Sequence, residues 1–140
     1  MNDEQATALL SQTVSYQELI KKFNEGNFDL AVENANEVIQ IKNGSADLVQ
    51  KSEEVLELME AIEEIFLAKT EQYEKALNYF EDEKYDDAKV QFSDTLNMNL
   101  DHPKFDSLYE RIELLNDNIE LAILNKEKEK EAREEKVRKK

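Results

Sequence analysis

Residues 45 to 82 read SADLVQKSEEVLELMEAIEEIFLAKTEQYEKALNYFED, without a glycine or a proline. Apolar side chains recur through this stretch every three or four residues, as on one face of an α-helix. The pattern predicts one long helix from about 45 to 82, with Thr70 as the place for any bend, because the stripe softens there. The stripe consists of Leu48, Val55, Leu58, Met59, Ile62, Ile65, Phe66, Tyr73, Ala76, Leu77 and Phe80.

The whole chain is poor in residues that break helices. Its 140 residues include two glycines and one proline, whereas average usage is about 7% and about 5%. So few breakers leave little material for the turns of a β-sandwich or barrel. The absence of cysteine excludes a disulfide scaffold and a thiolate zinc site. No apolar run is long enough to span a membrane, so we expect no direct membrane insertion.

Three breaks separate the expected helices. At residues 24 to 27 a glycine that can adopt positive φ precedes an asparagine that can cap the next helix. At residues 43 to 45 a glycine precedes a serine in the same way. At residues 99 to 103 a proline suits the first turn of the following helix, and residues 81 to 84 form a weaker break. These breaks predict an all-α fold of about five helices, two of them long.

The chain also carries a weak internal repeat. Residues 9 to 48 align without a gap on residues 66 to 105, at an offset of 57. Chance alignment of two amphipathic stretches is the alternative, but several of the identities lie on the predicted buried stripes, which favours a repeat. The six identical pairs are Leu10/Leu67, Thr13/Thr70, Tyr16/Tyr73, Phe23/Phe80, Asp29/Asp86 and Ala31/Ala88.

Both copies share a pattern of aromatic and small residues around their first turn. An aromatic residue ends one helix, another opens the next helix, and an alanine follows three residues later. Residues 19 to 31 and 76 to 88 therefore resemble the tetratricopeptide repeat, although the second copy has Glu83 in place of the turn glycine. The resemblance implies an antiparallel helical repeat, a fragment of a tetratricopeptide-like solenoid, with a period lengthened by the long helix. The implied repeat core is Phe23, Gly26, Phe28, Ala31, Phe80, Tyr85, Ala88 and Phe92.

Charge divides the chain into two regions. Residues 126 to 140 hold eight bases and five acids, whereas residues 1 to 125 hold 10 bases and 28 acids. We expect a helical domain over 1 to 125, with unit one at about 9 to 65 and unit two at about 66 to 122. Residues 126 to 140 are expected to form a charged C-terminal helical extension. The acidic domain should repel nucleic acid, so we expect no nucleic-acid partner.

Residues with catalytic or metal-binding chemistry are few. His102 is the only histidine, and Asp101 beside it would not face it from the start of a helix. We therefore expect His102 to be a cap or a surface residue. The acidic residues 81 to 87 lack the spacing of a calcium-binding loop. No phosphate-binding or dinucleotide motif is present, so we expect no enzyme, no cofactor and no metal site.

Two functions from different classes follow. The resemblance implies a concave surface for protein binding, with Tyr16, Lys22, Tyr73 and Tyr79 as contact residues. The net charge of −15 favours a basic or amphipathic peptide or helix as partner of such a scaffold. The alternative is a structural helical spacer, or a membrane-proximal stalk in a longer, envelope-anchored bacterial protein. Self-association through the long helices would use the heptad-like positions Phe105, Leu108, Ile112, Leu115, Ile119 and Ala122.

The compartment stays open between the cytoplasm and, for a domain of an anchored protein, an extracytoplasmic location. A chain without cysteine fits both.

Overall fold

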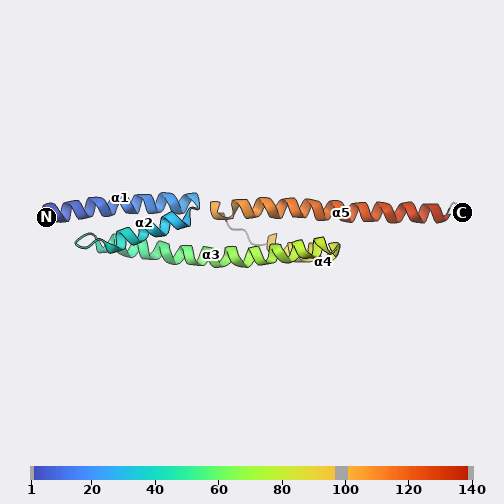
Figure 1. Cartoon of the computed structure of the whole chain (residues 1–140), viewed down its shortest axis with the longest axis horizontal. Helices are drawn as coiled ribbons and strands as arrows, with labels where there is room; N and C mark the ends of the chain where they lie inside the picture. Colours follow the sequence, from blue (N-terminus) through green and yellow to red (C-terminus); the bar gives the residue numbers. More distant parts are fainter. Residues whose placement is uncertain (1, 97–100, 139–140) are drawn as a thin grey trace. The chain divides into compact units, whose positions relative to one another are not determined.

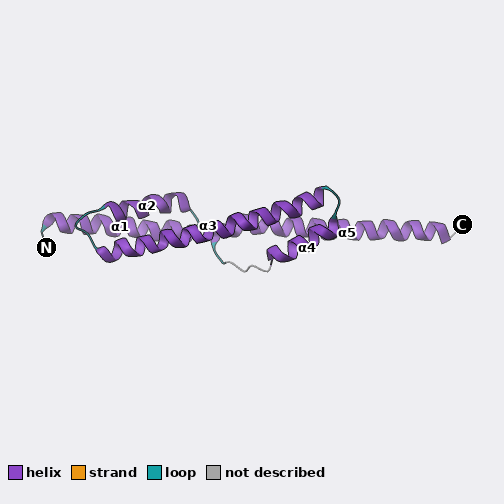
Figure 2. Cartoon of the chain, turned by 90° about the horizontal axis from the view of Figure 1, so that it is seen from below, coloured by secondary structure: helices purple, strands orange, loops and turns teal. Residues whose placement is uncertain are grey.

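The computed structural model describes residues 2 to 96 and 101 to 138, which form helices joined by short loops (Figures 1 and 2). No strand occurs among these residues, so the predicted all-α fold of five helices, two of them long, is confirmed. Helix α3 closely matches the long helix expected from 45 to 82. The elements are α1 (Asp3–Glu25), α2 (Phe28–Gln40), α3 (Ala46–Glu81), α4 (Tyr85–Leu96), a 3₁₀ turn η1 (Pro103–Phe105) and α5 (Asp106–Arg138).

The chain forms two compact units that are not contiguous in sequence. Unit 1 contains Met1–Phe66 together with Asp101–Lys104. Unit 2 contains Leu67–Leu100 together with Phe105–Lys140. Helix α3 thus contributes its first part to unit 1 and its second part to unit 2. The expected repeat units, 9 to 65 and 66 to 122, remain a prediction about sequence register.

The helix ends in unit 1 follow the expected breaks. Asn2 and Gln5 form a reciprocal capping box at the start of α1, with the Gln5 N–H donating to Asn2 Oδ1 at 2.8 Å. Helix α1 ends at Gly26, whose φ of 81° lies in the left-handed region. Asn27 caps α2 by accepting a hydrogen bond from the Leu30 N–H at 3.4 Å. Ser45 Oγ accepts from the Leu48 N–H at 3.3 Å and so caps α3.

The second break differs in detail from the expected glycine stop. Its left-handed residue is Asn43, with φ of 65°. Gly44 is needed for a different reason, because a Cβ there would collide with Oε1 of Gln12. Gln12 is fully buried and ties α1 to this loop: its Oε1 accepts from the Ser45 N–H at 2.7 Å, and its Nε2 donates to the Val38 carbonyl at 3.2 Å. A buried polar side chain is thereby paired at both ends.

The core of unit 1 lies between α1, α2 and the first part of α3. Two alanines of α2, Ala31 and Ala35, are fully buried, and small side chains there let the helices pack closely. Leu19, Phe28 and Met59 complete the buried cluster. Tyr16, Phe23, Val55, Leu56 and Ile62 pack around it with part of their surface exposed.

Unit 2 is built from the end of α3, α4 and α5. Lys69 is fully buried, and its Nζ donates to the hydroxyl of Tyr109 at 3.3 Å. The stripe expected to drive self-association through α5 is mostly internal: Phe105, Leu108, Ile112, Leu115 and Ile119 are buried. The expectation that this stripe is free for a partner is therefore corrected. Every residue of α5 from 124 to 138 is exposed.

The third break is described only from residue 101 onward. Pro103 opens the 3₁₀ turn η1, and α5 begins at Asp106. Residues 99 and 100 of the expected break lie outside the described residues.

Candidate peptide-binding turns

The turn that joins α1 to α2, residues 23 to 28, is called the first turn here. Phe23 ends α1 and Phe28 opens α2, and their rings stack at 5.6 Å between centroids with an interplanar angle of 2°. The Gly26 N–H donates to the Phe23 carbonyl at 3.1 Å, and the Asn27 N–H donates to the Lys22 carbonyl at 2.9 Å. These two bonds satisfy the last carbonyls of α1 and fix the turn.

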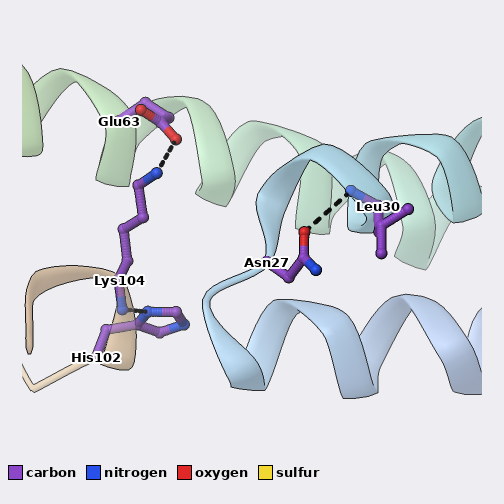
Figure 3. A network of polar contacts seen from close by, with 5 residues as sticks. All are labelled: Asn27, Leu30, Glu63, His102 and Lys104. Atoms are coloured by element: carbon purple, nitrogen blue, oxygen red, sulfur yellow. Dashed lines mark hydrogen bonds and ion pairs between the residues drawn. The ribbon is translucent and has the colours of Figure 1, made fainter.

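A distant part of the same chain, the docked segment Asp101–Lys104, lies on the first turn. The His102 ring is 4.9 Å from the Phe23 ring and 5.4 Å from the Phe28 ring, and is tilted against both. Nδ1 of His102 accepts a hydrogen bond from the Lys104 backbone N–H at 3.0 Å (Figure 3). This bond folds the docked segment back on itself and places the Lys104 side chain against α3.

Lys104 makes the polar contacts of the docked segment. Its ammonium lies 2.9 Å from a carboxylate oxygen of Glu63 on α3 (Figure 3). It also lies 5.3 Å from the centroid of Phe28 and 4.9 Å from that of Phe66, within reach of a cation–π attraction to both rings. One lysine is thus held by one carboxylate and two aromatic rings.

Gly26 allows the docked segment to approach. A Cβ at position 26 would lie 2.9 Å from the backbone nitrogen of Lys104, which is closer than real Cβ contacts. The first turn therefore accepts the main chain of the docked segment because Gly26 has no side chain.

The turn that joins α3 to α4, residues 80 to 85, is called the second turn. The Glu83 N–H donates to the Phe80 carbonyl at 3.0 Å, and the Lys84 N–H donates to the Tyr79 carbonyl at 2.8 Å. Both bonds have the positions of the first-turn bonds shifted by 57 residues. The Phe80 and Tyr85 rings are also 5.6 Å apart, but tilted at 53°. Glu83 takes the left-handed conformation that glycine takes in the first turn, with φ of 62°.

A cavity of about 320 Å³, the second-turn cavity, lies beside this turn. Residues 83 to 87 line it on one side, and Ile123, Lys126 and Glu127 of α5 line it on the other. The ammonium of Lys126 lies 5.2 Å from the centroid of the Tyr85 ring. Four acidic and two basic side chains surround the cavity, so its lining has a net negative charge.

Of the four predicted contact residues, two in each unit, Lys22 and Tyr79 adjoin the turns. Lys22 directly precedes Phe23 and forms an ion pair of 3.5 Å with Glu25. Tyr79 directly precedes Phe80, is partly buried, and has its carbonyl bonded to the second turn. Tyr16 and Tyr73 lie about two helical turns earlier and are partly buried. Tyr16 packs on the core of unit 1 instead of standing out from it.

The predicted repeat-core residues are buried or partly buried. Phe28, Ala31, Ala88 and Phe92 are buried. Phe23, Gly26, Phe80 and Tyr85 are partly buried around the two turns.

Sequence reasoning missed the residues that occupy the first turn. His102, expected as a cap or a surface residue, does cap the turn η1 by accepting the Lys104 N–H, but its ring also packs on two phenylalanines, because the chain returns to unit 1 at this point. Neither Lys104 nor Glu63 was predicted to contact the other or to take part in a binding site. The available signal was that Lys104 is the only base between residues 90 and 110 and directly follows the proline. For the buried polar residues Gln12 and Lys69, the sequence gives no indication of burial beyond their place near the apolar stripes of predicted helices.

A shifted pKa is found on α3, at Lys51. Asp47 raises the pKa of Lys51 above its ordinary value, first through a hydrogen bond and second through its charge, with the two side chains 3.1 Å apart on α3. This pair is exposed and lies away from both turns.

A scan against protein-family models found no match for the chain, and neither did searches of curated proteins and of solved structures. Within the described residues, no group of three or more histidine, cysteine, aspartate or glutamate side chains is placed to hold a metal ion. None of the described helices is both long enough and apolar enough to cross a membrane.

Proposed function

We propose that the chain is a non-catalytic protein–protein interaction module that binds a basic or amphipathic peptide or helix. One observation carries the proposal: the first turn already holds a segment of the chain whose lysine contacts Glu63 and the rings of Phe28 and Phe66. The fold therefore contains a surface that holds the lysine of a neighbouring segment, here a segment of the same chain.

The charge of the chain supports the same class of partner. The net charge of −15 produces a negative field that attracts basic polypeptides and repels nucleic acid. Such a field raises association rates and selects among partners more than it raises affinity.

An array of synthetic twelve-residue peptides of basic, neutral and acidic composition, probed with the full chain, tests the proposal. We expect retention on basic peptides at low salt and no retention on acidic ones. A matched pair of variants, Tyr79→Ala and Tyr109→Ala, separates binding from stability. Tyr79→Ala should weaken peptide binding with a nearly unchanged melting temperature, whereas Tyr109→Ala removes a partner of buried Lys69 and should lower the melting temperature. Equal retention of acidic and basic peptides would contradict the proposal.

The second candidate is the helical spacer that associates with itself. Exposed leucines on α5 favour it: Leu114, Leu121 and Leu124 are 63%, 56% and 46% exposed. The first two are seven residues apart, which is the spacing of a coiled-coil seam. Sedimentation equilibrium of the full chain and of the Leu114→Lys/Leu121→Lys variant distinguishes the candidates. Only for a self-associating spacer should the double substitution lower the measured molecular mass from that of an oligomer to that of a monomer.

A further inference from the structure

We infer that the second-turn cavity is a binding site for a lysine-containing segment of another polypeptide. This inference rests on the proposed function and assigns it to one place. Three observations carry it: the equivalence of the two turns, the occupied state of the first turn, and the charge and lining of the cavity beside the second turn.

The two turns are equivalent in backbone geometry. Each carries two hydrogen bonds at corresponding positions, a left-handed fourth residue and an aromatic pair 5.6 Å apart. In the first turn, these features support the docked segment Asp101–Lys104. In unit 2, the corresponding place is the second-turn cavity of about 320 Å³.

The lining of the cavity corresponds in part to the surface that holds Lys104. The offset of 57 places Tyr85 at the position of Phe28 and Ile123 at the position of Phe66. Both residues line the cavity. The cavity in unit 2 is therefore lined by an aromatic ring and an apolar side chain, at the positions whose counterparts in unit 1 contact the Lys104 side chain.

Glu83 changes the mode of approach. Gly26 leaves room for the backbone of the docked segment, whereas Glu83 carries a side chain at the same position and lines the cavity. The main chain of a partner must stay farther away, and its lysine side chain is the part that enters. Glu83, Asp86 and Asp87 supply carboxylates there, as Glu63 does for Lys104 in unit 1.

Lys126 occupies the cation position within unit 2. Its ammonium lies 5.2 Å from the Tyr85 centroid, much as Lys104 lies 5.3 Å from the Phe28 centroid. Lys126 is an exposed side chain on α5 and can move aside at little cost. An incoming lysine takes its place over the ring, so Lys126 acts as a competitor of the partner.

The test uses the full chain labelled with ¹⁵N and a capped peptide of sequence DHPKF, which copies residues 101 to 105. We expect saturable amide shift changes at residues 83 to 87 and 123 to 127, with a Kd of about 0.1–1 mM for so short a ligand. A peptide carrying Lys104→Gln should bind about fivefold more weakly, because it lacks the charge attracted by the ring and the carboxylates.

Variants of the protein distinguish binding in the cavity from a general effect of the net charge on peptide affinity. Lys126→Ala should strengthen peptide binding about threefold, and Lys128→Ala, which removes the same charge from a position outside the cavity lining, should do so by less. Tyr85→Phe should bind like the natural chain, whereas Tyr85→Leu should weaken binding about threefold or more while keeping an apolar side chain in place.

The outcomes distinguish this inference from the proposed function. Shifts at the cavity that depend on the peptide lysine, with Lys126→Ala binding more tightly than Lys128→Ala, support it. Saturable binding with shifts elsewhere, or equal effects of the two lysine variants, overturns the cavity and leaves the proposed function standing. Absence of shifts at about 5 mM peptide, a concentration well above the expected Kd, overturns the cavity site. The peptide array then decides the proposed function separately.

Discussion

Two features favour glycine at position 26, a left-handed backbone and a close neighbouring main chain. Position 83 has the left-handed backbone. Gly26 has a left-handed φ of 81° and the Lys104 backbone directly above it. Glu83 also has a left-handed φ, 62°, but it is exposed and lines the cavity. A side chain in this conformation costs about 1–2 kcal/mol.

Gly26→Ala should lower the free energy of unfolding by about 1–3 kcal/mol, because strain and the clash with Lys104 add. Glu83→Gly should change it by less than about 1 kcal/mol, because relief of strain offsets the greater freedom of the unfolded chain. Urea unfolding followed by circular dichroism measures both. A Gly26→Ala chain as stable as the natural one would show that the docked segment does not press on the turn.

Ala88→Leu should lower the free energy of unfolding by about 1–3 kcal/mol. Ala88 is fully buried where α4 packs in unit 2, and added methylenes overpack a filled site. Ala132→Leu is the control, since position 132 is exposed on α5 and the same substitution should have almost no effect there. Thermal melts of both variants give the comparison, and equal small effects would remove the argument for close helix packing at position 88.

At the scale of elements, α5 changes character along its length. Its first half buries Leu108, Ile112, Leu115 and Ile119. Its residues from 124 to 138 are all exposed. Stability should therefore come from the first half, since exposed residues bury no apolar surface.

A chain shortened to end at residue 128 should unfold at nearly the same denaturant concentration as the full chain. The described residues that it removes, 129 to 138, are all exposed, and it keeps Lys126 and Glu127 at the second-turn cavity. Urea unfolding checks stability, and sedimentation velocity checks whether mass changes. A large loss of stability would mean that the exposed half of α5 packs on something, such as a second copy.

The sequence was sufficient for the elements because they depend on local patterns. The apolar stripe of residues 45 to 82 and the caps at Asn27 and Ser45 lie within a few residues of what they determine. The occupied first turn depends instead on contacts between Phe23 and His102, which are 79 residues apart. Nothing local to His102 indicates two phenylalanine rings as its neighbours, so the site could not be read from spacing.

Buried polar residues illustrate the same limit. Gln12 is buried because it satisfies the loop at Ser45, and Lys69 is buried against Tyr109. Each lies within a predicted helix, where pattern alone would place a glutamine or a lysine at the surface. Only the partner on another element reveals the burial.

For the whole molecule, charge should govern the rate of association. A basic peptide should bind more slowly as salt rises from about 0.05 to about 0.5 M, because screening shortens the reach of the −15 net charge. Stopped-flow fluorescence with a labelled basic peptide measures the rate. Duplex DNA is the control and should show no binding at about 0.15 M salt. A rate that does not depend on salt would contradict steering by the acidic surface.

The docked segment has a practical consequence for cutting the chain into pieces. A fragment of residues 1 to 66 ends at the last residue of the first stretch of unit 1 but lacks Asp101–Lys104. The rings of Phe23 and Phe28 would lose their His102 neighbour in such a fragment. Unit 1 is therefore discontinuous in sequence. A fragment of residues 1 to 66 should fold into the complete unit only when residues 101 to 104 are supplied by a second fragment or joined to its end.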